Sequence, residues 1–171
     1  MSRTTDYLPP KLLEKGFDRT AFDCGIEPLN EYLRKYALQN QKRDAARTYV
    51  VVDPDDRILG YYTLVFGAVE PDDVPDSISS GLGRYQIPII LIARLAVDLS
   101  EKGKGLGGFL MREAFLRTIQ AAEIAGLRAV MVEAKDENAR AFYEKVGFRR
   151  SPSDQFKLFL NISDIRKNLD V

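Results

Sequence analysis

The chain reads LAVDLSEKGKGLGG from Leu95 to Gly108. This stretch continues the nearly unbroken apolar run of Ile87–Val97, which is typical of a central strand covered on both faces. Glycines let backbone N–H groups approach a ligand closely, and the helix expected after them adds about half a positive charge at its N-terminus. Lys102 and Lys104 add full charges. The stretch predicts a strand that enters a phosphate- or pyrophosphate-binding loop; the alternative is a flexible turn with solubilising lysines.

Outward from this loop, the apolar periodicities predict a single α/β domain over residues 1–171 with a mixed sheet. Helices are expected over Glu27 to about Arg43, Leu106 to about Ala125 and Asp136–Val146, and strands over Thr48–Val52, Ile58–Val69, Ile87–Val97, Arg128–Ala134 and Gln155–Ile162. A brief strand or an extended arm is expected at Leu12-Leu13. Glu70–Tyr85 is predicted to be a loop that can include a short helix. The last helix of the three should bury Ala139, Phe142 and Val146, and Ser163 is expected to cap a terminal helical turn.

Composition excludes several kinds of chemistry. The 171 residues include no His, which rules out Ser-His-Asp and Cys-His catalysis and His-ligated metals. One cysteine, Cys24, cannot form an internal disulfide. No apolar run is long enough for a signal peptide or a membrane span, so we expect a cytoplasmic protein without a membrane partner. The 25 basic and 25 acidic residues give zero net charge, so an anionic partner would need a local basic patch.

Two common nucleotide-binding motifs do not explain the loop. The GxxxxGK[ST] spacing of a P-loop is missing. Gly103, Gly105 and Gly108 match the letters of GxGxxG, but they follow a hairpin in mid-chain instead of the first strand of a parallel βαβ unit.

The loop resembles the Q/R-x-x-G-x-G/A pyrophosphate loop of the GCN5-related N-acetyltransferase (GNAT) superfamily, with Lys102 where Gln or Arg is usual. The later segment Asn138–Phe148 (NARAFYEKVGF) is similar to that superfamily's N-x-x-A-x-x-F/Y-Y-x-x-x-G-F. Together the two motifs cover roughly residues 45 to 160. The resemblance implies a GNAT fold, in which two parallel strands splay apart, and acetyl-CoA as cosubstrate with no metal.

The resemblance also implies roles for individual residues. The main chain of Leu95 and Val97 would hold pantetheine and polarise the thioester carbonyl, and Asn138 would bond a cofactor amide or, alternatively, cap its helix. The pyrophosphate would be bound by the loop residues Lys102, Gly103, Lys104, Gly105, Leu106, Gly107 and Gly108. Tyr143 would protonate the departing thiolate, since a phenol with a pKa near 10 keeps its proton at neutral pH. The alternative for Tyr143 is packing beneath the helix, a role that Phe142 could fill instead.

The N-terminal segment narrows the resemblance. Phe22-Asp23-Cys24-Gly25, followed by Leu29-Asn30-Glu31-Tyr32-Leu33, resembles the start of GNAT toxins from bacterial toxin–antitoxin pairs, and Arg94–Asp98 is similar to their usual strand ending. Such toxins acetylate the α-amino group of aminoacyl-tRNA, are commonly dimeric and are inhibited by a small ribbon-helix-helix antitoxin. The resemblance therefore implies an acetyltransferase toxin with these partners.

An α-amine suits a chain without His. Its pKa of about 7.7–8.0 leaves a useful neutral fraction at pH 7, whereas a lysine amine near 10.4 would need a strong base. Glu133 is a candidate base or water-orienting group, with a solvent-facing charge as the alternative. Phosphates of tRNA would meet a candidate basic patch made of Arg34, Lys35, Lys42, Arg43 and Arg47. The remaining alternatives are a GNAT enzyme that acetylates a small amine, a protein N-terminus or a lysine, and a binding module without turnover.

Overall fold

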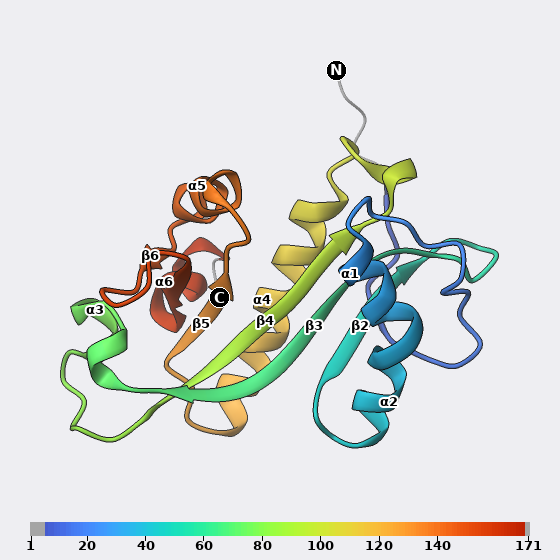
Figure 1. Cartoon of the computed structure of the whole chain (residues 1–171). Helices are drawn as coiled ribbons and strands as arrows, with labels where there is room; N and C mark the ends of the chain where they lie inside the picture. The colour runs from blue at the N-terminus through green and yellow to red at the C-terminus, as the bar shows by residue number, and fades with distance from the viewer. Residues whose placement is uncertain (1–5, 170–171) are drawn as a thin grey trace. The chain divides into compact units, whose positions relative to one another are not determined.

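A computed structural model describes residues 6–169 of the chain. It contains a mixed seven-stranded sheet in the order β1-β2-β3-β4-β5-β7-β6. The strands are β1 (Lys11–Leu12), β2 (Arg47–Val52), β3 (Ile58–Val69), β4 (Ile87–Val97), β5 (Ala129–Glu133), β6 (Arg149–Arg150) and β7 (Lys157–Asn161). The helices are α1 (Glu27–Glu31), α2 (Ala37–Lys42), α3 (Asp76–Ser79), α4 (Leu106–Ile124), α5 (Glu137–Val146) and α6 (Ile162–Asn168). The predicted α/β class and mixed sheet are confirmed (Figure 1).

The chain divides into two compact units, and β3, β4 and α4 each pass from one unit into the other. The first unit holds residues 6–65 and Ala93–Ala114, and the second holds Phe66–Ile92 and residues 115–169. Within the part of the chain that the structure describes, no helix is long and apolar enough to cross a membrane.

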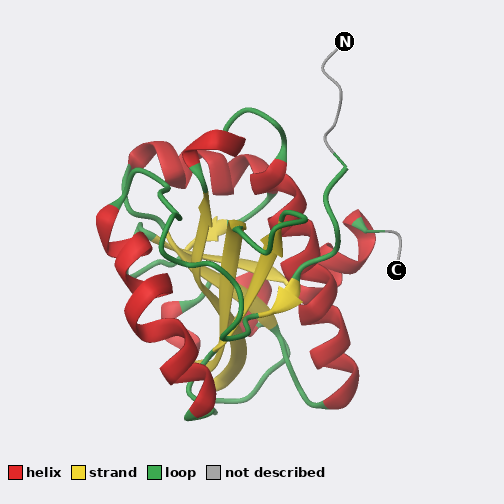
Figure 2. Cartoon of the chain, turned by 90° about the vertical axis from the view of Figure 1, so that its right-hand side faces the viewer, coloured by secondary structure: helices red, strands yellow, loops and turns green. Residues whose placement is uncertain are grey.

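The first unit buries strands between helices (Figure 2). One face of β2 and β3 packs against α1 and α2 through an apolar cluster that includes Leu33, Ala37, Val50 and Tyr61. On the other face, a Cβ built on Gly60 would lie 3.0 Å from side-chain atoms of Leu106 and Leu110, the first turns of α4. Gly60 therefore lets α4 approach the sheet closely.

The helix predicted from Glu27 is present, but it is interrupted. Residues Tyr32–Tyr36 form a π-helical turn between α1 and α2, in which the Ala37 N–H donates to the Tyr32 carbonyl. Leu33 and Ala37 are buried as expected, whereas Leu29 is half-buried and Asn30 takes the buried position beside it. The π turn adds one residue to the helical ladder, which moves the buried face away from a simple i, i+4 stripe.

The second unit has its own core, formed by α3, β4, β5 and β7. β4 and β5 are parallel neighbours, as the GNAT resemblance implies for one pair of strands, with Ile89, Ile90 and Leu91 opposite Ala129, Val130 and Met131. The described ladder ends at Leu91, and β4 continues to Val97 with no described partner on β5. β5 instead pairs along its whole length with β7, in antiparallel register.

Two local predictions in this unit are wrong, and one alternative is excluded. Phe142 is 52 % exposed, so α5 does not bury it, whereas Tyr143 is half-buried. The cap of α6 is Asn161, whose side chain accepts from the Ser163 N–H, and Ser163 is not the cap. Asp136 caps α5 by accepting from the Ala139 N–H, so Asn138 does not. In α6 the capping side chain lies two residues before the predicted one, because this helix begins at Ile162, earlier than expected. α5 begins within one residue of its predicted start.

Candidate active site

The end of β4 leads directly into the glycine loop, as predicted. After Val97 the chain makes a 3₁₀ turn over Leu99–Glu101, and α4 begins at Leu106. Gly103 and Gly105 have φ angles of +78° and +86°, a region that side chains other than glycine rarely adopt. These two positions therefore explain the two glycines before the helix.

The loop has room for a ligand. A Cβ built on Gly103, Gly105 or Gly108 would meet nothing within 4 Å, and one on Gly107 would meet only Val97 Cγ2, at 3.9 Å. The backbone here is thus uncovered at the N-terminus of a 19-residue helix, where N–H groups and the helix dipole favour an anion. This geometry fits the pyrophosphate group that the resemblance implies.

The two lysines of the loop differ in their surroundings. Lys104 Nζ lies 3.2 Å from Glu101 Oε2 in an ion pair. Lys102 is exposed and has no ion pair within residues 6–169. Glu101 is itself held by the Tyr7 hydroxyl, which donates to its Oε1 at 3.1 Å. Lys102 is therefore the lysine whose charge faces solvent without a carboxylate beside it.

A buried carboxylate fixes the entry to the loop. Asp98 accepts from the Ser100 N–H, the Ser100 hydroxyl and the Asp23 N–H, and its Oδ2 lies 3.1 Å from Arg57 Nη2. Burial acts to raise the pKa of Asp98, but these hydrogen bonds and Arg57 outweigh it and hold the pKa below its usual range. Arg57 Nε is buried without a hydrogen-bond partner among the described residues.

The network continues into the N-terminal segment. Asp23 Oδ1 accepts from the Gly25 N–H at 2.8 Å and from Asn30 Nδ2 at 3.0 Å, and these bonds lower the pKa of Asp23. Asn30 is buried, and its Oδ1 accepts from the Cys24 N–H at 2.9 Å. The residues that carried the N-terminal resemblance thus connect the start of α1 to the loop. Their structural role was not predictable from the local sequence, because one of these bonds joins residues that are 75 positions apart.

The predicted catalytic tyrosine lies in the second unit, on α5. The Tyr143 ring makes edge-to-face contacts with Phe148 (centroids 5.5 Å apart) and Phe142 (5.6 Å). Burial raises the pKa of Tyr143, so its phenol keeps the proton more firmly than a free tyrosine does. Gly147, at φ +122°, ends α5, and its N–H donates to the Tyr143 carbonyl. Tyr143 can therefore act as a proton donor at neutral pH.

The other predicted residues are placed as follows. Asn138 is exposed in the first turn of α5, and Glu133 is exposed at the end of β5. The loop, Leu95 and Val97 lie together in the first unit, whereas Asn138 and Tyr143 belong to the second. No group of three or more His, Cys, Asp or Glu residues that could hold a metal ion occurs between residues 6 and 169.

Ion pairs occupy much of the candidate basic patch. Arg34 pairs with Glu27, Lys35 Nζ lies 3.3 Å from Glu31 Oε1, and Arg47 Nη2 lies 2.8 Å from Asp44 Oδ1. Lys42 and Arg43, at the end of α2, are exposed and have no described carboxylate partner in residues 6–169. The surface charge of the patch is thus concentrated on these last two residues.

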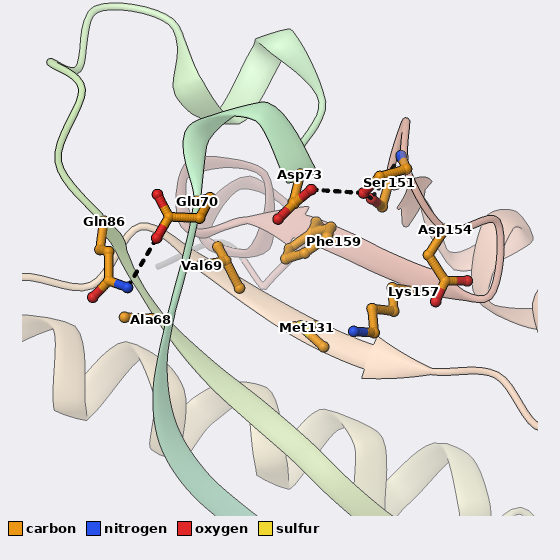
Figure 3. Close-up of a pocket in the computed structure, with 11 residues that line it drawn as sticks. Ala68, Val69, Glu70, Asp73, Gln86, Met131, Ser151, Asp154, Lys157 and Phe159 are labelled. Atoms are coloured by element: carbon orange, nitrogen blue, oxygen red, sulfur yellow. Dashed lines mark hydrogen bonds between the residues drawn. The ribbon is translucent and has the colours of Figure 1, made fainter.

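A separate pocket of about 520 Å³ lies in the second unit and contains none of the predicted site residues (Figure 3). Its three acidic side chains already accept hydrogen bonds: Glu70 from Gln86 at 3.0 Å, Asp73 from the Ser153 hydroxyl at 2.8 Å and Asp154 from the Phe156 N–H at 2.9 Å. The pocket therefore offers no evident chemistry of its own.

Comparisons with known proteins agree with this geometry. Residues 44–150 match the family described as acetyltransferase (GNAT) domain. A tRNA-acetylating toxin of Mycobacterium tuberculosis is 40 % identical over 160 residues, which are 94 % of this chain and 95 % of that protein.

Solved structures give the same result. AtaT complexed with acetyl-methionyl-tRNAfMet has a TM-score of 0.87 and 28 % identity, with 94 % of this chain and 98 % of that chain covered. A tyrosine-mutant AtaT toxin bound to the C-terminus of the antitoxin AtaR and acetyl-CoA has a TM-score of 0.82 and 27 % identity, covering 97 % of this chain and 100 % of that one. The chain therefore belongs to the GNAT acetyltransferase superfamily, in the part of it that includes tRNA-acetylating toxins.

Proposed function

We propose that this chain is an acetyl-CoA-dependent N-acetyltransferase that acetylates the α-amino group of aminoacyl-tRNA and acts as a toxin. The observation that carries the proposal is its similarity, along nearly its whole length, to a tRNA-acetylating toxin. The uncovered glycine loop at the start of α4 adds support from this chain's own geometry.

Acetyl-CoA would supply the activated acetyl thioester. The loop from Lys102 to Gly108 would bind its pyrophosphate through backbone N–H groups and the Lys102 charge. The main chain of Leu95 and Val97 would hold the pantetheine arm, in the part of β4 that has no described β5 partner. The Asn138 side chain would form a hydrogen bond with an amide of the cofactor, since Asp136 and not Asn138 caps this helix.

Tyr143 is proposed as the general acid. Attack by a neutral amine forms the new C–N bond and breaks the C–S bond, and the phenol proton passes to the departing sulfur. The raised pKa of Tyr143 supports this role, because the group is protonated over the whole neutral range. The attacking nitrogen loses its proton to water, which exposed Glu133 could orient at the end of β5.

An α-amine remains the best acceptor for a site of this composition. The chain has no His, and an α-amine with a pKa near 8 needs little help to become neutral, whereas a lysine needs a strong base. For tRNA binding we assign the leading role within the patch to Lys42 and Arg43, since Arg34, Lys35 and Arg47 already pair with carboxylates.

The wider organisation belongs to the same proposal. We infer one GNAT domain over residues 1–171, a homodimer in the cytoplasm, and inhibition by a small ribbon-helix-helix antitoxin. The structure of AtaT bound to the C-terminus of its antitoxin AtaR supports the part of this inference that concerns an antitoxin protein.

Expression in a bacterial host tests the proposal. Wild type should arrest growth and yield acetylated aminoacyl-tRNA, whereas Tyr143→Phe should lose about 10²- to 10⁴-fold in kcat with acetyl-CoA binding near normal. Tyr85→Phe makes the same chemical change on a side chain that is 86 % exposed and serves as the matched control.

Each outcome has a separate meaning. Unchanged kcat in Tyr143→Phe would remove the acid role while leaving the substrate assignment intact. Wild-type turnover on small amines, peptides or lysine but not on aminoacyl-tRNA would support the alternative acceptors instead.

A further inference from the structure

Arg94, on β4, is a half-buried arginine with unused hydrogen-bond donors. Its guanidinium carbon lies 3.6 Å from the centroid of the Tyr32 ring. Within residues 6–169 its guanidinium has no described hydrogen bond or ion pair. A guanidinium carries five N–H donors and a permanent positive charge. Arg94 is therefore a fixed cation whose donors are available to an anion.

The ring beneath Arg94 is held firmly. Tyr32 is 5 % exposed and packs in the apolar cluster with Phe22 and Tyr61. It also begins the π-helical turn, and such turns often occur at functional sites. A guanidinium stacked on a rigid aromatic face loses less conformational freedom when it binds a ligand. The packing thus sets the position of the cation in advance.

The alternation of β4 separates Arg94 from the pyrophosphate loop. Ala96 packs in the cluster with α1 and α2, so Arg94, two residues earlier, lies on that same face. Val97 points to the opposite face, where its Cγ2 lies 3.9 Å from a Cβ built on Gly107. The anion for Arg94 is therefore a different one from the pyrophosphate proposed at the loop.

We propose that Arg94 binds the phosphodiester adjacent to the terminal nucleoside of aminoacyl-tRNA and so positions the α-amine. The inference rests on the proposed function. In this substrate the amino-acid carboxyl is esterified, and the amine is neutral or positive. The nearest anion to the reacting nitrogen is consequently that phosphate, and a planar guanidinium binds two phosphate oxygens at once.

Steady-state kinetics of Arg94→Gln and Arg94→Lys test the assignment. With aminoacyl-tRNA, Arg94→Gln should lower kcat/KM about 10- to 100-fold, mainly through KM. The plot of log(kcat/KM) against log salt concentration has a negative slope, and the size of this slope should decrease by about one. KM for acetyl-CoA should not change. Arg94→Lys keeps the charge and should restore part of the loss.

Truncated acceptors locate the contact. We expect Arg94→Gln to impair the reaction of an aminoacyl-adenosine that carries a 5′-phosphate and to leave the reaction of the same compound without that phosphate unchanged. Equal loss on both compounds would overturn the phosphate contact. A raised KM for acetyl-CoA that disappears with acetyl-dephospho-CoA would assign Arg94 to the cofactor instead.

Controls separate binding from folding. Arg166→Gln removes a charge on α6 and should leave every kinetic constant unchanged. Tyr32→Leu removes the stacking face beneath Arg94 and should raise the KM for aminoacyl-tRNA. Melting temperatures identify any variant whose loss reflects misfolding. An active wild type with an unaffected Arg94→Gln would overturn this inference alone, while a wild type inactive on aminoacyl-tRNA would overturn the proposed function with it.

Discussion

At the scale of single residues, the glycines of the loop provide a direct test of the cofactor site. Gly105 has a φ of +86° with open space around it, so Gly105→Ala introduces backbone strain of about 1–2 kcal/mol without a side-chain clash. The strained loop should reorient its N–H groups and raise the KM for acetyl-CoA. Enzyme kinetics together with chemical denaturation measure the two effects separately.

Gly81 supplies the matched control for that substitution. It has a φ of +78° and equally open surroundings, but it lies in the segment between α3 and β4. Gly81→Ala should lower stability by a similar amount and leave the KM for acetyl-CoA unchanged. If both variants changed that KM alike, general destabilisation and not the loop geometry would explain the result.

The conformation of the glycine loop was predictable from sequence, because glycines just before a helix indicate backbone angles that other residues rarely adopt. Burial on α5 was not predictable, since Phe142 and Tyr143 are adjacent and similar in size. Arg94 carried no sequence signal for its stacking, because Tyr32 is 62 positions away in the chain and contacts it only after folding.

At the scale of elements, Asn30 joins the start of α1 to the loop segment through Cys24 and Asp23. Asn30→Ala leaves the buried Cys24 N–H without its acceptor and should lower the free energy of unfolding by about 1–3 kcal/mol. Asn40→Ala makes the same change in α2, where the described side-chain contact is a long 3.4 Å bond to the Tyr32 hydroxyl. Equal losses in urea unfolding would contradict the role of Asn30.

The elements differ in how well their sequences determined them. Ile58–Val69 and Ile87–Val97 are strands with the predicted bounds, because long β-branched and apolar runs leave few alternatives. The π turn was not predictable, since Leu29, Leu33 and Ala37 fit an uninterrupted α-helix equally well. Asn30 and Tyr32 are both buried beside this turn, and the periodicity of the three apolar residues does not indicate either.

At the scale of the whole chain, the absence of His predicts how stability depends on pH. His is the side chain that ordinarily titrates between pH 5 and 8, and this chain contains no His. Asp23 and Asp98 have lowered pKa values, and Tyr61 and Tyr143 have raised ones because of burial. These groups titrate outside the neutral range, and the free energy of unfolding should be nearly flat between about pH 5 and 9.

The two limits of that plateau have opposite causes. As the pH falls below about 4, the unfolded chain takes up protons before the folded carboxylates do, so stability is lost. As the pH rises above about 10, the unfolded chain releases tyrosine protons that the folded state retains, and stability is lost again. Asp98→Asn should lower stability at pH 7 and make the acid limb shallower. Asp164→Asn, at an exposed side chain in the first turn of α6, should change stability at pH 7 by less than about 1 kcal/mol. Urea unfolding across this pH range measures both limbs, and a large loss between pH 6 and 8 would show that another group controls stability.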